Sequence, residues 1–176
     1  DPNPILILEH KGLYWSKIPG TENAKTIEPD ENYILPIGKA CKVIEAESNF
    51  ENSGESVVII TYGRGVYWSL EAAKYFAGKI EILDLRTLSP LDEEQILKSV
   101  KKHGRSLIVT EEPSSASFSL GIAGFIQENC FEFLDAPVKI VGSENTPAIP
   151  LNEHLEYTYL PNADKVKAAL SSLLAY

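Results

Sequence analysis

The sequence contains no methionine, only two cysteines among its 176 residues, and three histidines. Because a natural start residue is missing, we expect the chain to be a piece of a longer protein. The two cysteines, Cys41 and Cys130, lie far apart, and neither belongs to a CxxC pair or has a histidine at metal-binding spacing. This pattern favours two buried thiols in a reducing compartment, with a disulfide or a catalytic thiol as the alternatives.

The sequence also lacks a long apolar segment and an excess of basic residues. No apolar run approaches the ~20 residues of a membrane-spanning helix, and the first residues lack the basic-then-apolar layout of a signal peptide. The chain has 25 acidic and 16 basic residues, for a formal net charge of -9. This charge disfavours binding to nucleic acid or to an anionic membrane. It suits a basic protein partner, and equally an acidic surface that only keeps the protein in solution.

From residue 57 onward, short apolar runs alternate with amphipathic segments. The apolar runs predict buried strands at 57–62, 80–85, 106–110 and 137–141. The amphipathic segments predict helices over 65–76, from Asp92 to Gly104, over 117–130 and from Asn162 to the end. Short connections between strands and helices are typical of βαβ units. The sequence therefore predicts an α/β fold with three layers, α/β/α, around a mostly parallel sheet.

The first 50 residues follow a different pattern. Residues 4–8 form a strand-like run without an obvious partner, which we interpret as the remnant of a preceding domain; an edge strand of the same sheet is the alternative. Residues 12–32 have no period of a helix or a strand and predict an irregular segment. Residues 33–38 and 41–44 are expected to be extended, and 49–54 to form a turn.

None of the three histidines has a spacing that suggests zinc. We expect His10, His103 and His154 to have surface or capping roles, and His103 to lie at the negative end of a helix dipole. The turn at 63–65 has two glycines, but it lacks the third glycine of a dinucleotide fingerprint and the Lys-Ser/Thr of a P-loop. A turn that only starts a helix is therefore favoured over a phosphate site.

Acidic residues end two of the predicted strands. Glu111 and Glu112 are expected at the carboxyl edge of the sheet, where α/β folds bind ligands, and Asp84 is expected at the same edge. Paired carboxylates hold metals or act in acid–base chemistry, but adjacent strand residues point to opposite faces, so these two need not converge. The sequence has no Ser-His-Asp arrangement and no GxSxG elbow. We therefore predict no catalytic and no cofactor-binding residue in this chain.

The most specific motif is the run Asp-Leu-Arg-Thr-Leu-Ser-Pro-Leu-Asp at 84–92. Further segments accompany it at 1–4, 8–14, 35–40, 61–66, 70–73, 111–113, 134–138 and 160–164. Their order and spacing resemble the C-terminal region of the β subunit of the thiamine-diphosphate-dependent 2-oxo acid dehydrogenases. These are the decarboxylating components of the pyruvate and branched-chain 2-oxo acid dehydrogenase complexes, and the resemblance covers essentially the whole chain.

The resemblance implies two parts: residues 1–30 as the remnant of a pyrimidine-binding domain with its connector, and residues 31–176 as a transketolase C-terminal-like domain. It implies a parent oxidoreductase that decarboxylates a 2-oxo acid with thiamine diphosphate and Mg²⁺ and transfers the acyl group to lipoyl. The family's cofactor-activating glutamate and active-site histidines lie upstream, and its α subunit or α half holds the diphosphate. We therefore expect this chain to bind no cofactor and to be inactive alone.

The resemblance also implies partners and a location. Asp1 and Asn3 match a segment that helps to ligate a structural potassium ion. The C-terminal carboxylate, here of Tyr176, docks the basic subunit-binding domain of the lipoyl acyltransferase, and Asn145 replaces an aspartate that relatives often have near this contact. The domain is expected to pair with its mate about a two-fold axis. The bacterial cytoplasm is the preferred location, with the mitochondrial matrix as the alternative.

Three other interpretations remain open. The first is the C-terminal domain of a transketolase or a deoxyxylulose-phosphate synthase, against which the segment 10–14 argues. The second is a free-standing flavodoxin-like module that binds a small ligand at the 63–65 turn. The third is an interaction domain of a signalling protein, against which Thr61 and Tyr62 argue, because a receiver-type pocket needs paired acids at that strand end.

Overall fold

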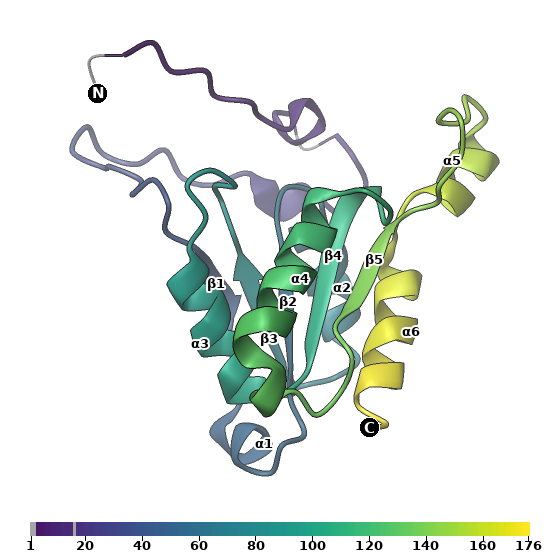
Figure 1. Ribbon diagram of the computed structural model, residues 1–176. Helices are drawn as coiled ribbons and strands as arrows, with labels where there is room; N and C mark the ends of the chain where they lie inside the picture. Colours follow the sequence, from purple (N-terminus) through teal and green to yellow (C-terminus); the bar gives the residue numbers. More distant parts are fainter. Residues whose placement is uncertain (1–2, 16) are drawn as a thin grey trace.

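Within residues 3–15 and 17–176, which the computed structural model describes, the apolar runs form a five-stranded sheet in the order β1-β3-β2-β4-β5 (Figure 1). The last four strands in chain order are parallel, and β1 pairs with β3 in the antiparallel direction. The strands are β1 (Cys41–Ile44), β2 (Val57–Thr61), β3 (Ile80–Asp84), β4 (Ser106–Pro113) and β5 (Lys139–Ser143). The sheet is therefore mostly parallel, as predicted.

Helices cover both faces of the sheet. Helices α2 (Gly65–Ala73) and α6 (Ala163–Leu173) pack on one face, and α3 (Glu93–His103) and α4 (Phe118–Cys130) on the other. Two shorter helices, α1 (Ser48–Asn52) and α5 (Glu153–Tyr159), lie near opposite ends of the strands (Figure 1). Because both faces are covered, every residue of β2 is buried, which explains its continuous apolar run. The three-layer prediction is confirmed.

The ends of the helices follow their local sequence. The Asp92 side chain caps α3 by accepting a hydrogen bond from the backbone N–H of Gln95 at 3.3 Å. Gly104 closes the same helix in the left-handed conformation, with φ of 66°. Asn162 caps α6. The Gln95 side chain does not complete a reciprocal capping box, since its Nε2 donates to Ser99 at 3.0 Å instead.

Three local predictions are wrong. Helix α2 ends at Ala73, before the predicted end at 76. The predicted turn at 49–54 contains most of α1. The strand predicted to end at 141 continues through Gly142 to Ser143; β4 and β5 change register here, and a Cβ at Gly142 would stand 2.8 Å from the backbone oxygen of Glu112. All three errors arise where contacts from distant segments decide the local conformation.

Residues 4–8 form no strand and pair with no strand of the described chain, and β1 occupies the edge next to β3. The alternative of an edge strand is therefore wrong. The segment runs as an extended trace past the carboxyl ends of the strands (Figure 1), and the side chains from Ile5 to Leu8 are 60–87% exposed. Among the described residues, no helix is long and apolar enough to cross a membrane.

Candidate functional site

Polar side chains from the N-terminal segment, β4 and the start of α2 meet at the carboxyl edge of the sheet. The Nε2 of His10 lies 2.7 Å from Oε2 of Glu111. The Nη1 of Arg64 lies 3.7 Å from Oε1 of the same carboxylate. Glu111 thus joins three segments that are distant in sequence. Instead of the surface or capping role that we predicted, His10 forms a half-buried pair with a carboxylate.

Glu112 has different partners from those of Glu111, in agreement with the alternation of strand side chains. Its Oε1 accepts hydrogen bonds from the Tyr62 hydroxyl at 3.1 Å and from the backbone N–H of Ser119 at 2.9 Å. Burial raises the pKa of the Tyr62 phenol to about 12, against the lowering effect of its hydrogen bond with Thr110. Tyr62 therefore stays protonated at neutral pH and serves as a donor that positions Glu112.

Asp84 lies at the same edge, as predicted, because it pairs in register with Thr61 at the end of β2. It does not join the two glutamates. Its Oδ1 accepts a hydrogen bond from the backbone N–H of Arg86 at 3.1 Å. Burial raises the pKa of the Asp84 carboxyl, and the Arg86 backbone bond opposes this effect. The carboxylates of Asp84, Glu111 and Glu112 therefore each have separate partners and do not form a pair with one another.

The turn at 63–65 does not fit a phosphate group. The backbone N–H groups of Gly65 and Val66 already donate to the carbonyls of Tyr62 and Gly63, at 3.1 and 3.3 Å. Glu111 also brings negative charge to Arg64, the one cation of this turn. The N–H groups of Gly65 and Val66 are therefore not available to a diphosphate, including that of thiamine diphosphate, and the charge of Arg64 is already paired with Glu111. The alternative of a module that binds a phosphate-bearing ligand at this turn gains no support from the geometry.

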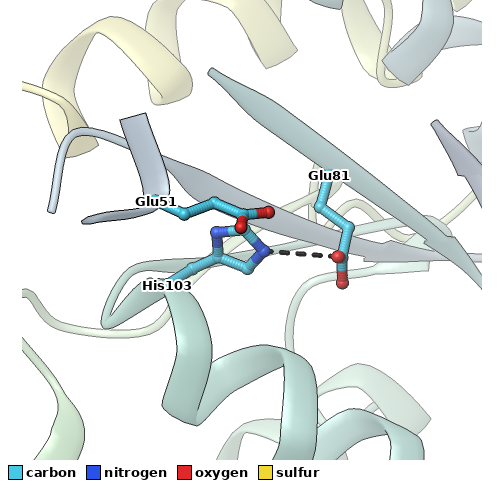
Figure 2. Close-up of side chains that lie close together, drawn as sticks. All are labelled: Glu51, Glu81 and His103. Carbon is cyan, nitrogen blue, oxygen red and sulfur yellow. Dashed lines mark ion pairs between the residues drawn. The ribbon is translucent and has the colours of Figure 1, made fainter. Parts of the chain in front are cut away.

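A second polar cluster lies at the opposite edge of the sheet, and the sequence reasoning missed it. Glu81, in the middle of an apolar run, is fully buried and faces His103 in the last turn of α3. Figure 2 shows these two side chains beside Glu51 of α1. The His103 Nε2 lies 3.4 Å from Oε2 of Glu81, and its Nδ1 lies 2.7 Å from the hydroxyl of Ser56. The signal in the sequence was a charged residue, Glu81, between two apolar residues of a predicted buried strand.

Glu51, Glu81 and His103 offer ligand atoms that lie within 4.8 Å of one another, a spacing that suits a metal ion. Two ammonium groups already neutralise the carboxylates. The Nζ of Lys42 lies 3.1 Å from Glu81, and the Nζ of Lys102 lies 2.5 Å from Glu51. A divalent cation would have to enter against both charges. We therefore assign this cluster as a structural ion network.

The ion network predicts a specific loss of stability in acid. Burial pushes the pKa of Glu81 upward, but the neighbouring polar groups of His103, Ser99 and Lys42 outweigh this effect and lower the pKa from 4.5 to about 2. Between these two values the unfolded chain binds more protons, so the stability contributed by Glu81 is full above about pH 4.5 and is lost as the pH falls toward 2. We expect Glu81→Gln to lose less stability between pH 6 and pH 3 than the wild type, as measured by urea unfolding.

The exposed Glu128→Gln variant is the control for this measurement, because it removes one carboxylate without a buried partner. Its pH dependence should match that of the wild type. An identical pH dependence of Glu81→Gln and Glu128→Gln would contradict the assignment.

The two residues predicted for docking, Asn145 and Tyr176, are not brought together within the described chain. Asp1 lies outside the described residues, and Asn3 is exposed in the N-terminal segment. Asn145 lies in an exposed loop after β5. Tyr176 is 63% exposed and follows α6, which runs back along the sheet for about 16 Å, so the chain ends at the opposite edge from that loop (Figure 1). The potassium and docking roles stay predictions.

The other two histidines and the two cysteines agree only in part with the predictions from the sequence. His103 is the last residue of α3, as predicted, but it is buried rather than a surface residue. His154 is exposed but lies in the first turn of α5, not in an irregular stretch. Within the described chain both cysteines are free thiols; Cys130 is buried, and Cys41 is only partly so.

The fold and these sites define a class of α/β domain without a catalytic constellation among its described residues. Residues 46–166 match the model of the family described as "Transketolase, C-terminal domain", and the chain belongs to that family. A solved structure, the "Split gene transketolase, inactive beta4 tetramer", is similar to 83% of this chain and 45% of its own chain, with a TM-score of 0.67. Its sequence identity is 21%, so this likeness supports the fold alone.

Curated relatives narrow the comparison to beta subunits. The chain is 34% identical to the 2-oxoisovalerate dehydrogenase subunit beta of Bacillus subtilis, over 100% of this chain and 50% of the relative. It is 34% identical to the Pyruvate dehydrogenase E1 component subunit beta of Rickettsia conorii, with the same coverage of 100% and 50%. It is 33% identical to the Acetoin:2,6-dichlorophenolindophenol oxidoreductase subunit beta of Bacillus subtilis, over 99% and 47%. The resemblance to these beta subunits is confirmed, and the chain spans about half the length of each.

Proposed function

We propose that this chain is the C-terminal assembly and acyltransferase-docking domain of the decarboxylating component of a 2-oxo acid dehydrogenase. The observation that carries the proposal is the similarity of the whole chain to beta subunits named for 2-oxoisovalerate and pyruvate dehydrogenases. The parent enzyme would oxidatively decarboxylate a 2-oxo acid with thiamine diphosphate and Mg²⁺ and transfer the acyl group to lipoyl. The bacterial relatives favour a location in the bacterial cytoplasm.

The exposed apolar side chains support an assembly role. The run from Ile5 to Leu8 is joined by Trp15, Ile27 and Ile34, which are 69%, 94% and 83% exposed. Large exposed apolar areas in soluble proteins mark surfaces that another protein covers. We infer that a preceding pyrimidine-binding domain, to which residues 1–30 belong, a second copy of the beta subunit and an alpha subunit cover them. Residues 31–176 would then be the C-terminal domain itself.

In this proposal the cofactor is held elsewhere in the parent enzyme. Among the described residues, the strand-to-helix turn at 63–65 is the place where an α/β sheet would receive a diphosphate, and the N–H groups of Gly65 and Val66 are already bonded there. The neighbouring carboxylates of Glu111 and Glu112 have protein partners as well. The chain alone should therefore bind neither thiamine diphosphate nor the substrate.

The docking role is tested at the C-terminus. We expect deletion of Ala175 and Tyr176 to weaken binding to the subunit-binding domain of the host's lipoyl acyltransferase by about tenfold, because it moves the terminal carboxylate away from a basic partner. The melting temperature should change little, since Tyr176 is exposed and contributes one backbone hydrogen bond, to Leu173 at 3.3 Å. Surface plasmon resonance with the immobilised subunit-binding domain measures the affinity.

The matched control is Tyr176→Phe, which keeps the carboxylate and the ring and should bind within about twofold of the wild type. Equal affinity of the deletion variant would refute the role of the C-terminal carboxylate. Absence of binding by the wild-type chain, or micromolar binding of thiamine diphosphate with Mg²⁺, would contradict the wider proposal.

A further inference from the structure

A pocket of about 490 Å³ lies between α2, the turn around Gly20 and the connection from α5 to α6. It adjoins the carboxyl-edge cluster through Arg64, but neither His10 nor Glu111 lines it, and no residue of the buried ion network does. We call it the α2–α5 pocket. None of the activities or partners proposed above uses it, although its size is that of a small-ligand site.

Aromatic rings form much of the wall of the α2–α5 pocket. Tyr67 and Trp68 come from α2, and Tyr157 comes from α5. The Arg64 guanidinium already stands over the Trp68 ring, 4.8 Å from its centroid. The faces of aromatic rings attract cations, and the interaction strengthens when solvent is partly excluded. The resident contact shows that this wall accepts a guanidinium group.

Carboxylates form the polar part of the wall. Glu71, Glu153, Glu156 and Asp164 line the pocket, and Arg64 is the one basic residue among its lining residues. Glu71 pairs with a lysine, and Asp164 accepts a hydrogen bond from Tyr157 at 3.4 Å. Within the described chain, the carboxylates of Glu153 and Glu156 have no ion-pair partner. The pocket therefore presents uncompensated negative charge beside aromatic rings, on a chain whose net charge is -9.

The spacing of these carboxylates suits an organic cation better than a metal ion. The acidic residues around the α2–α5 pocket come from α2, α5 and α6, and they do not bring ligand atoms together. In the part of the chain that the structure describes, only Glu51, Glu81 and His103 converge closely enough for a metal ion. A compact metal ion would leave most of this pocket empty, whereas a planar or branched organic cation reaches both the rings and the carboxylates.

We propose that the α2–α5 pocket binds an organic cation, of the guanidinium or alkylammonium class, whose apolar surface lies on the aromatic rings and whose charge faces Glu153 and Glu156. An arginine or lysine side chain of another protein and a free amine share this chemistry. Neutral and anionic molecules of the same size lack the interaction with the carboxylates and are excluded.

The probes are ethylguanidinium and butylammonium chloride, with N-ethylurea as the neutral match, all at constant ionic strength. Binding is followed by the fluorescence of Trp68 in a Trp15→Phe background, since these are the two tryptophans of the chain. We expect saturable binding of both cations with dissociation constants on the order of 1–10 mM, and at least about tenfold weaker binding of N-ethylurea. Equal binding of N-ethylurea, or no saturable binding of either cation, would overturn the proposal.

Exposed side chains of the pocket allow substitutions that keep the fold. The double variant Glu153→Gln with Glu156→Gln should weaken cation binding about fivefold, and Tyr157→Leu about threefold. The matched control is Glu128→Gln with Glu132→Gln, which removes two exposed carboxylates next to the other face of the sheet and should change the affinity less than about twofold. Equal effects of the two double variants would show that general charge, and not this pocket, attracts the cation.

The blocked peptide acetyl-Gly-Arg-Gly-amide shows whether the bound cation is a side chain of a partner protein or a free small molecule. Binding about tenfold tighter than that of ethylguanidinium would assign the pocket to an arginine side chain of a partner protein. Equal affinities would assign it to a free amine or guanidine. Both outcomes support binding of an organic cation. Neither outcome depends on acyltransferase docking, so a negative docking experiment would not change the interpretation of this one.

Discussion

Replacing Lys42 with methionine is expected to lower the free energy of unfolding by about 3 kcal/mol. The Lys42 ammonium lies 3.1 Å from the carboxylate of Glu81, which is fully buried. Removing Lys42 leaves the buried carboxylate of Glu81 with the Lys102 ammonium as its nearest remaining cation, at the longer distance of 4.0 Å. Unfolding by urea at pH 7, followed by circular dichroism, measures the loss.

Two variants show whether the effect belongs to the buried charge. Lys74→Met removes a lysine whose partner, Glu71, is exposed, and it should leave the free energy of unfolding almost unchanged. The double variant Lys42→Met with Glu81→Gln removes both charges and should recover part of the loss, as a double-mutant cycle reports. If Lys42→Met costs no more than Lys74→Met, the ion network does not stabilise the fold in the way assigned here.

Gly65→Ala is expected to destabilise the chain by about 3 kcal/mol. Gly65 begins α2 directly against β4, and a Cβ there would collide with the hydroxyl of Thr61 and stand 3.0 Å from the carbonyl oxygen of Val109. The Thr61 hydroxyl is buried and donates to that same carbonyl at 2.9 Å, so it has no free space in which to move. Thermal and urea unfolding measure the change.

Gly124→Ala is the matched control for this substitution. Gly124 lies in the interior of α4, and a Cβ there would meet no atom within 4 Å. Alanine favours helix more than glycine, so this variant should be neutral or more stable by up to about 1 kcal/mol. Similar losses in the two variants would mean that the effect comes from glycine chemistry in general and not from the close approach at Gly65.

The sequence predicted the features that depend on near neighbours. The strand β2, the cap at Asp92 and the left-handed Gly104 are set by residues within a few positions, so periodicity and capping rules were sufficient. The start of α4 at Ser117 and the cap of α6 at Asn162 were predicted for the same reason. The family resemblance rested on longer motifs and did not depend on the geometry of any single residue.

The features that the sequence did not predict are contacts between segments that are far apart in the sequence. Glu81 and His103 meet because β3 and α3 pack at one edge of the sheet, and nothing within either segment encodes the pairing. The α2–α5 pocket needs α2, α5 and the turn around Gly20 together, and α5 itself was not predicted. Hydrophobic periodicity reports which face of a helix is buried, but it carries no information about which polar side chains of separate elements meet.

The order of the strands places the contact between His10 and Glu111 at the point of the sheet where α/β folds usually bind ligands. Helix α2 leaves β2 toward one face, and α4 leaves β4 toward the other, so the carboxyl edge between β2 and β4 is a topological switch point. Open α/β sheets bind their ligands at such points. Here the His10 imidazole stands against Glu111 in that position, 2.7 Å from its carboxylate. The N-terminal segment therefore acts as a built-in occupant, and a molecule from solution would have to displace it before reaching the end of β4.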